Sequence, residues 1–176
     1  TFYADSHVLY FSTHQYPLYP GTGSINETGS GEGEGLTVNV PLLAGWGDEE
    51  YLDVFDQVLV PVAERYQPQL ILVSAGYDAH WADDIALMQV SVTGFARMVH
   101  ALKYLARKLS LERLVFTLEG GYHLQAVSSS VKATLDVLLN SKNIDDPLGS
   151  EQRLRKPLGF DNFLKVIKDT HQLKAS

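Results

Sequence analysis

The sequence contains no cysteine, no long apolar run and no basic N-terminal segment. Without cysteine there is no disulfide framework and no thiolate ligand for a metal, although the cellular compartment stays open. No apolar run approaches the roughly 20 residues that a membrane-spanning helix needs, so we expect no membrane partner. The first residues, TFYADSHVLYF, lack the basic region and cleavage site of a signal peptide. A cytoplasmic protein is therefore expected, and the missing initiator methionine predicts a chain that begins within a longer sequence.

Basic side chains are also scarce, and they are unevenly placed. Residues 1–139 carry 16 acidic and 7 basic side chains, whereas residues 140–176 carry 5 and 7, and the net charge is -7. An acidic main body argues against a nucleic-acid partner and mildly favours cationic small substrates. The 176 residues, of which 45% are hydrophobic, suit one ordinary domain or a large part of a bigger one.

Short apolar segments alternate with amphipathic ones along the chain. We expect strands at residues 7–12, 36–42, 70–73 and 114–118, and helices that begin near Asp48, near Thr93 and after Gly121, with a last helix at residues 160–173. This alternation predicts an α/β fold with a parallel sheet. The continuous apolar run at residues 70–73 predicts a strand that is covered on both faces.

The helices carry more specific expectations. Pro61 is expected to kink the first helix, and Thr93 to cap the second. For the third helix, the spacing of apolar residues predicts a buried face made of Ala126, Val127, Val131, Leu135 and Leu138.

Residues 19–35, YPGTGSINETGSGEGEG, are rich in glycine and raise the question of a phosphate-binding loop. The segment lacks the terminal Lys-Ser/Thr of a P-loop, and it spells no G-x-G-x-x-G. It lies between two expected strands, so no helix N-terminus would face a phosphate. A nucleotide-binding module is therefore rejected. A flexible linker remains open, although Tyr19 and Pro20 are atypical of one.

Two turns at the carboxyl ends of expected strands carry polar side chains, and ligands of parallel sheets bind at such ends. They are SAGYDAH, residues 74–80, and EGGY, residues 119–122. Taken alone, Asp78 is more often a helix cap or turn residue, and Tyr122 is more often a packing aromatic. A metal shared by His80 and Asp78 is not favoured, and we expect His14 to be a structural histidine with satisfied hydrogen bonds.

Four segments together resemble the zinc-dependent histone deacetylase family, and most closely its bacterial histone-deacetylase-like and acetoin-utilisation-like amidohydrolases. The segments are VLYFSTHQYPLYPGTG, NVPLLAGWGDEEYL, LILVSAGYDAHWADD and FTLEGGYHLQAVSSSV, in the order found in the family. The resemblance implies a three-layer, parallel-sheet arginase/deacetylase-like fold, of which this chain is the C-terminal part. Residues 1–140 would be the motif-bearing part, and residues 141–176 a polar loop and a C-terminal helix.

The resemblance also implies site residues. Asp78 is expected to ligate zinc, and Tyr122 to donate a hydrogen bond to the amide carbonyl oxygen during attack. A zinc ion would polarise the acetyl carbonyl and activate water, and a histidine base would move the proton. The channel that admits the acetylated amine is expected to include Tyr19, Pro20, Ile85, Gly120 and Gly121.

Potassium is the second metal that the resemblance implies. Ser12 and Thr13 match a strand end that helps to hold a structural potassium ion, and a second potassium site matches Phe2, Asp5, Val8 and Leu36. One segment departs from the family, which usually has Asp-Pro-Leu where this chain has Asp83-Asp84-Ile85. Ile85 keeps an apolar contact near the channel, but the loss of the proline is expected to loosen that loop and to affect substrate selectivity.

The family's paired histidines and its Asp-x-His ligands belong to the preceding half of the fold, and this chain is expected to begin just after them. A catalytic zinc typically has three protein ligands, of which we assign one. The leading hypothesis is the C-terminal half of a deacetylase for acetyl-lysine or acetylpolyamines, inactive without its other half. The alternative is a non-catalytic scaffold or interaction fragment of the same fold.

Overall fold

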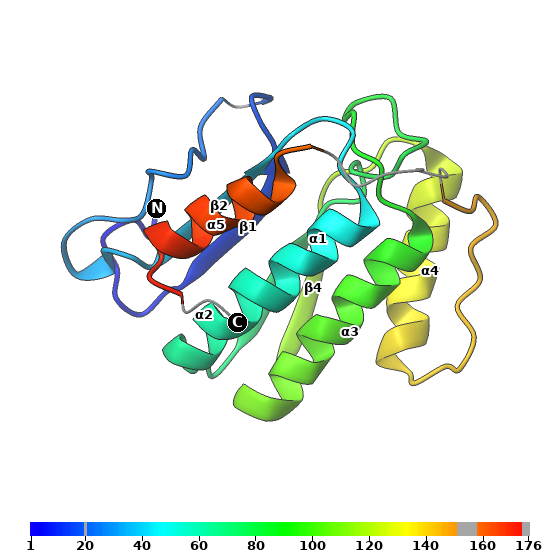
Figure 1. Ribbon diagram of the computed structural model, residues 1–176. Coiled ribbons are helices and arrows are strands. Elements are labelled where there is room, and N and C mark those ends of the chain that lie inside the picture. Colours follow the sequence, from blue (N-terminus) through cyan, green and yellow to red (C-terminus); the bar gives the residue numbers. More distant parts are fainter. Residues whose placement is uncertain (20, 151–157, 174–176) are drawn as a thin grey trace.

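Strands and helices alternate along the chain in the computed structural model, which describes residues 1–19, 21–150 and 158–173 (Figure 1). In chain order the elements are β1 (Tyr10–Gln15), η1 (Gly31–Gly33), β2 (Thr37–Leu42), α1 (Asp48–Val54), η2 (Phe55–Leu59), α2 (Val60–Tyr66), β3 (Ile71–Ala75), α3 (Val92–Leu109), β4 (Leu114–Leu118), α4 (Leu124–Leu138) and α5 (Phe160–Thr170). Here η1 is a 3-10 helix and η2 a π-helical turn. None of the described helices is both long and apolar enough to cross a bilayer.

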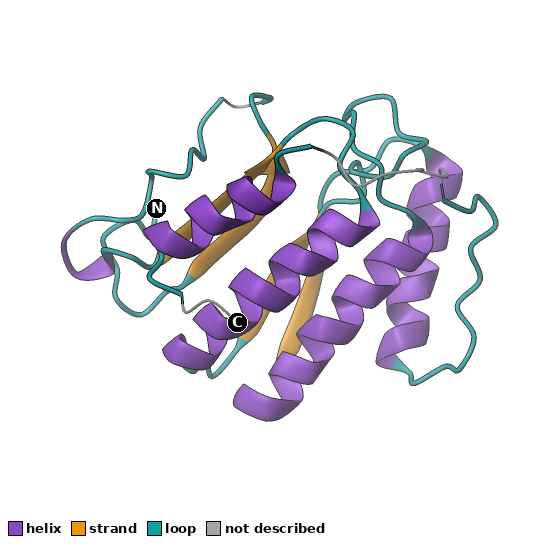
Figure 2. Cartoon of the chain, viewed as in Figure 1, coloured by secondary structure: helices purple, strands orange, loops and turns teal. Residues whose placement is uncertain are grey.

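The described strands form two parallel pairs (Figure 2). β1 pairs with β2 in a register that sets Tyr10 opposite Thr37, and β3 pairs with β4 in a register that sets Ile71 opposite Leu114. The parallel pairing agrees with the prediction, although β1 begins at Tyr10 rather than at His7.

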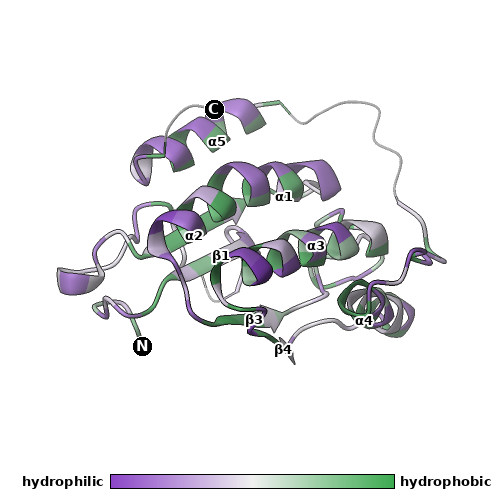
Figure 3. Ribbon diagram, turned by 90° about the horizontal axis from the view of Figure 1, so that it is seen from below, coloured by the Kyte–Doolittle hydropathy of each residue, from purple (hydrophilic) through white to green (hydrophobic). Residues whose placement is uncertain are grey.

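Helices α1, α2, α3 and α5 lie on one face of the strands, and α4 packs beside α3 (Figure 3). The main core lies between this helical layer and β2, all six of whose residues are buried. Its fully buried side chains include Val38, Val40, Leu42, Val54, Val58 and Val62. A smaller cluster joins α3 to α4. The chain therefore provides the sheet and one helical layer of the expected three-layer fold.

The second face of β3 and β4 is open in this chain, so the prediction of a strand covered on both faces is wrong here. Leu72 is 70% exposed, and its partner in register, Val115, is 49% exposed. The alternate residues Ile71 and Val73 are partly covered. The difference arises because the described helices pack against one face only, which an apolar run in a sequence cannot reveal.

The helix that follows β2 changes its hydrogen bonding before Pro61. α1 passes through η2 into α2, whose second residue is Pro61. A proline has no N–H to donate to the carbonyl four residues earlier. A π-helical turn is one way in which a helix accommodates such a gap, so the predicted kink takes this form.

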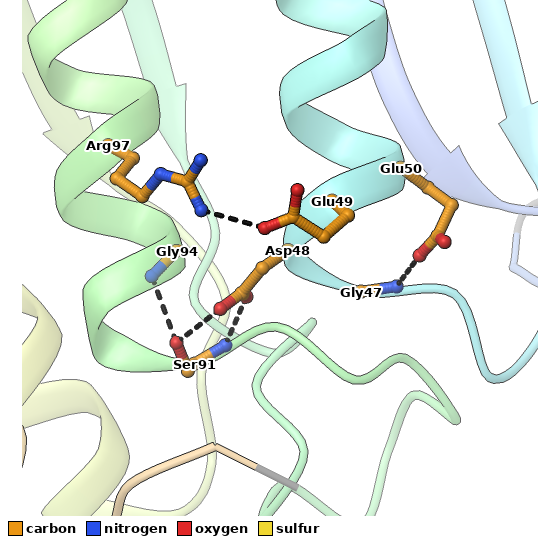
Figure 4. A network of polar contacts seen from close by, with 7 residues as sticks. All are labelled: Gly47, Asp48, Glu49, Glu50, Ser91, Gly94 and Arg97. Atoms are coloured by element: carbon orange, nitrogen blue, oxygen red, sulfur yellow. Dashed lines mark hydrogen bonds and ion pairs between the residues drawn. The ribbon is translucent and has the colours of Figure 1, made fainter. Parts of the chain in front are cut away.

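A partly buried polar clamp joins the N-terminal ends of α1 and α3 (Figure 4). The carboxylate of Asp48 accepts hydrogen bonds from the backbone N–H of Ser91, at 2.7 Å, and from its hydroxyl, at 2.6 Å. The hydroxyl of Ser91 in turn accepts from the N–H of Gly94 at 3.0 Å, so Ser91 is the N-cap of α3. The prediction that Thr93 caps this helix is therefore wrong, and Thr93 instead donates to Asp146.

The buried face of α4 also differs from the prediction. Ala126 is buried as predicted, and Val127, Val131 and Leu138 are partly buried against the core. Leu135 is 53% exposed, and the other buried positions are Ser130, Ala133, Thr134 and Val137. Small side chains let α4 approach α3 closely, and the hydroxyl of Thr134 lies 2.9 Å from that of Tyr77. The last helix, α5, ends at Thr170 rather than at Leu173.

Candidate active site

The two polar turns singled out in the sequence lie side by side at the carboxyl ends of β3 and β4. The N–H of Tyr77 donates to the carbonyl of Gly120 at 2.9 Å, and the N–H of Glu119 donates to the carbonyl of Ala75 at 3.0 Å. These bonds extend the β3–β4 pairing beyond the strands. Asp78 and Tyr122 therefore belong to two turns that contact each other, as the strand order predicted.

Glycines clear the space around the carboxylate of Asp78. A Cβ at Gly120 would lie 2.8 Å from Oδ2 of Asp78, and a Cβ at Gly76 would lie 2.9 Å from its Oδ1. Any larger residue at either position would crowd the carboxylate. The space and the hard oxygen donors suit a metal ligand, so the structure fits the single zinc ligand that the sequence assigned to this chain.

The electrostatic setting of Asp78 favours a bound cation. Burial raises the pKa of the Asp78 carboxyl, and the negative charge of Asp83 adds to the rise, against a hydrogen bond from its own backbone. A raised pKa means that the negative charge is disfavoured without a positive partner. Among the described residues no group of three His, Asp or Glu side chains could hold a metal. Asp78 therefore belongs to no complete metal site among the described residues.

The turn that carries Tyr122 depends on its glycines. Gly121 has a φ of 131°, and a Cβ there would lie 2.4 Å from a methyl carbon of Val127. Only glycine suits this conformation and this contact. The side chain of Tyr122 is 64% exposed, so its hydroxyl is accessible from outside the chain.

Asp83 is a site residue that the sequence reasoning missed. Its side chain is 4% exposed, and its Oδ2 accepts from the backbone N–H of Tyr122 at 2.6 Å and of His123 at 3.0 Å. Its Oδ1 accepts from the N–H of Ile85 at 3.0 Å. The only signal in the sequence was an acidic pair in the loop that follows SAGYDAH. Nothing in that pattern indicates that one of the two carboxylates is buried.

Two of the histidines considered in the sequence, His80 and His14, have surroundings typical of structural residues. His80 is fully buried, its Nδ1 accepts from the N–H of Ala82 at 3.0 Å, and its ring stacks on Phe95. Burial lowers the pKa of His80, which favours the neutral ring. His14 lies 3.0 Å from the hydroxyl of Ser12 through Nδ1 and 3.0 Å from the carbonyl of Gly23 through Nε2. The satisfied histidine predicted at position 14 is therefore present.

The residues expected to form the channel are only partly gathered. Gly120 and Gly121 lie in the turn beside Asp78, whereas Tyr19 is 95% exposed and Ile85 is 56% exposed on separate loops. Pro20 lies outside the described residues. The N–H of Leu87 donates to the side chain of Gln15 at 2.7 Å, so the loop that carries Ile85 is fastened to the end of β1.

A cavity of about 400 Å³ lies elsewhere, between α5 and the loop that follows β1. Its lining includes Tyr16, Trp46 and Phe163, and none of the residues expected at the active site. Its walls are mainly aromatic and aliphatic, and the described residues that line it include no carboxylate, histidine or lysine.

The residues expected to bind potassium occupy two regions. Ser12 and Thr13 lie in β1. The carbonyl of Leu36 accepts from the N–H of Tyr10 at 2.9 Å, and the carbonyl of Phe2 accepts from the N–H of Asp5 at 3.1 Å. Val8 lies between Asp5 and Tyr10, in the segment that precedes β1. Because a carbonyl oxygen has two lone pairs, these bonds leave room for a further interaction.

The chain is similar to a set of deacetylases. Residues 1–138 match a family model described as Histone deacetylase domain. The chain is 44% identical over 175 residues to "Histone deacetylase 14, chloroplastic" of Arabidopsis thaliana, covering 99% of this chain and 40% of that protein. It is 48% identical over 124 residues to a "Probable deacetylase" of Archaeoglobus fulgidus, covering 70% of this chain and 34% of that protein.

Two solved structures are also similar. The crystal structure of the HDA15 HD domain has a TM-score of 0.82 at 31% identity, over 97% of this chain and 45% of that chain. The histone deacetylase Clr3 has a TM-score of 0.83 at 32% identity, over 97% of this chain and 28% of that chain. The chain thus spans less than half the length of each of these relatives.

Proposed function

The chain belongs to the histone deacetylase family, and from this premise we propose that it provides one part of the active site of a zinc-dependent deacetylase. The likeness to solved histone deacetylase structures confirms the α/β fold, of which the chain is a part. The proposed reaction is hydrolysis of an N-acetyl amide, such as acetyl-lysine or an acetylpolyamine. The observation that carries the proposal is the contact between the turn of Asp78 and the turn of Tyr122.

In the proposed mechanism each turn has one task. Asp78 would be a zinc ligand, and zinc, when bound, supplies Lewis-acid polarisation of the acetyl carbonyl and a lowered pKa for bound water. The hydroxyl of Tyr122 donates a hydrogen bond to the oxygen that becomes negatively charged as water attacks. Gly120 and Gly121 let the substrate approach the backbone of this turn. A histidine from outside this chain would take the proton of the water and return it to the leaving amine.

The rest of the domain is the proposed partner of this chain. The chain spans about 40% of the length of its Arabidopsis relative. The open face of β3 and β4 carries large apolar side chains, among them Leu72, at 70% exposed, and Val115, at 49%. Exposed apolar surface of this kind is typical of an unfinished core. We propose that the rest of the domain covers this face and supplies the other zinc ligands, so that the isolated chain is inactive.

Two further expectations stay predictions. Potassium at Ser12 and Thr13, with a weaker second site at Phe2, Asp5, Val8 and Leu36, rests on the family resemblance. A cytoplasmic location rests on the sequence, and the relative named as chloroplastic shows that members of this family differ in location.

The test uses the complete deacetylase domain that includes this chain and a fluorogenic acetyl-lysine peptide. Tyr122→Phe removes one hydroxyl, and we expect kcat to fall by roughly 100- to 1,000-fold because an oxyanion donor is lost. Tyr104→Phe is the matched control, since Tyr104 lies exposed on α3 and should leave kcat unchanged. Full activity in Tyr122→Phe would overturn the role of Tyr122. No activity in the wild-type domain would favour the scaffold alternative.

The proposed dependence on the rest of the domain has its own test. Calorimetry of zinc binding to this chain alone should give no stoichiometric, tight binding, because one carboxylate is a weak ligand set. Stoichiometric binding by the isolated chain would contradict this part of the proposal.

A further inference from the structure

The carboxylate of Asp83 is bound by backbone amides of its own loop and of the distant turn of Tyr122. Oδ2 accepts from Tyr122 and His123, which lie 39 and 40 residues away, and Oδ1 accepts from Ile85. The side chain is 4% exposed. Hydrogen bonds to a charged acceptor are stronger than neutral ones, and a buried acceptor that loses its donors is costly. One carboxylate thus holds the turn of Tyr122 against the loop of Ile85.

Apart from the backbone bonds that join Glu119 and Gly120 to the neighbouring turn, the turn of Tyr122 has few other means of holding its position. Gly120 and Gly121 bring no side chains to pack, and the ring of Tyr122 is 64% exposed rather than wedged in a core. The place of the Tyr122 hydroxyl therefore depends mainly on where the backbone lies. The 2.6 Å bond from the Tyr122 amide to Asp83 fixes that backbone directly.

A simple helix-capping role does not account for Asp83. α4 begins at Leu124, and its N-cap is His123, whose Nδ1 accepts from the N–H of Ala126 at 3.2 Å. The cap of α4 is therefore provided locally. Asp83 binds the residues at and before the cap, and those residues include the tyrosine of the proposed site.

We propose that Asp83 is a positioning residue that holds the hydroxyl of Tyr122 in line for the reacting carbonyl. The inference rests on the proposed function of Tyr122. Asp83 touches neither substrate nor metal in this role, and it acts through the backbone of the turn. Its second bond, to Ile85, sets the loop expected at the channel in a fixed relation to the same tyrosine.

The first test is kinetic and uses the complete domain. Asp83→Asn cannot accept from all three amides, so we expect kcat to fall by about 10- to 100-fold, since misplacement of a reacting group by about 1 Å costs up to that much. KM should change by less than about threefold. In a Tyr122→Phe background the same substitution should cost less than about threefold, because the hydroxyl that it positions is gone.

The control is Asp48→Asn, which weakens a second, partly buried carboxylate clamp whose bonds go to Ser91 and not to the turn of Tyr122. It should lower thermal stability and leave kcat within about twofold, and its small effect should be the same in the Tyr122→Phe background. Equal losses for Asp83→Asn in both backgrounds would reduce Asp83 to a structural residue and overturn the proposal.

The second test does not depend on activity. Amide hydrogen exchange measured by NMR should be at least about tenfold faster for Tyr122 and His123 in Asp83→Asn, with exchange in β2 unchanged. Unchanged protection of these two amides would also overturn the proposal. If Asp83→Asn does not fold, Asp83→Glu keeps a carboxylate with a longer reach, and the same two comparisons decide with it. Full activity in Tyr122→Phe alone would instead remove the proposed function, while the exchange result would still report whether Asp83 holds the turn.

Discussion

Asp48, at the start of α1, and Asp78, in the turn that follows β3, are two carboxylates with different surroundings. Asp48 is matched by donors, because the N–H and the hydroxyl of Ser91 both bind it at 2.7 Å or less. Asp78 lies in space that Gly76 and Gly120 keep clear, and its pKa is raised by burial. The first carboxylate stabilises the fold, whereas the second costs stability and stays available for a cation. Four experiments test these expectations.

The largest effect is expected from Asp78→Asn in the complete domain. An amide is a much weaker metal ligand than a carboxylate, so we expect deacetylase activity to fall by on the order of 1,000-fold, with a matching loss of bound zinc. Activity and metal content, the latter by atomic emission, should fall together. Asp48→Asn, which is the same chemical change, should leave both within about twofold.

Gly94→Ala should produce the largest loss of stability. A Cβ at position 94 would lie 2.0 Å from Oδ1 of Asp48, so α3 would have to move away from α1. Overpacking of this kind costs about 3 kcal/mol in the free energy of unfolding. Urea denaturation measures this loss. An unchanged free energy of unfolding would mean that the clamp is not rigid.

The third experiment compares the direction in which two matched substitutions change the free energy of unfolding. Asp48→Asn weakens two charge-assisted bonds and should lower the free energy of unfolding by about 1–2 kcal/mol. Asp78→Asn removes a charge that the fold disfavours, so without zinc it should raise that free energy, by about half a kcal/mol or more. Thermal unfolding of both variants at pH 7 checks the signs. A loss in both would show that the hydrogen bonding of Asp78 outweighs the cost of burying its charge.

The smallest effect is expected when the pH is lowered and thermal stability is measured. Burial lowers the pKa of His14, His80 and His171 below the ordinary value of 6.5. A histidine with a depressed pKa in the folded state binds its proton more readily when unfolded, so its stability contribution is complete above pH 6.5 and is lost as pH falls below it. The Tm should therefore fall by a few degrees between pH 7.5 and 5.5. His171→Leu should reduce that fall, since the buried ring nitrogens of His171 have no partner among the described residues.

Much of the fold followed from periodicity, and the exceptions have physical reasons. The strand at residues 114–118 was predicted at its observed bounds because a short run of β-branched and apolar residues before a Gly-Gly turn is typical of a strand. The cap of α3 was not, because Ser91 and Thr93 are both suitable caps locally. The distant carboxylate of Asp48 decides between them. Leu135 was misassigned because small residues, not large ones, make close helix contacts.

Some residues of the candidate site could also be predicted from the sequence, and others could not. Asp78 and Tyr122 could be paired in advance, because each follows a parallel strand and such strands end at the same edge. Asp83 could not, because it lies in a loop without periodicity and its partners are 39 and 40 residues away. The open face of β3 and β4 could not be predicted either, because an apolar run in a sequence does not show which segments cover it.

The bonds of Asp83 bear on how substrate preference could be redesigned. Only the backbone N–H of Ile85 takes part, and the side chain of Ile85 is 56% exposed. Side chains of many sizes at position 85 could therefore be screened without disturbing the tyrosine, with one exclusion. Proline at 85 has no N–H and would release the loop, whereas proline at 84, in place of Asp84, removes no amide that Asp83 uses.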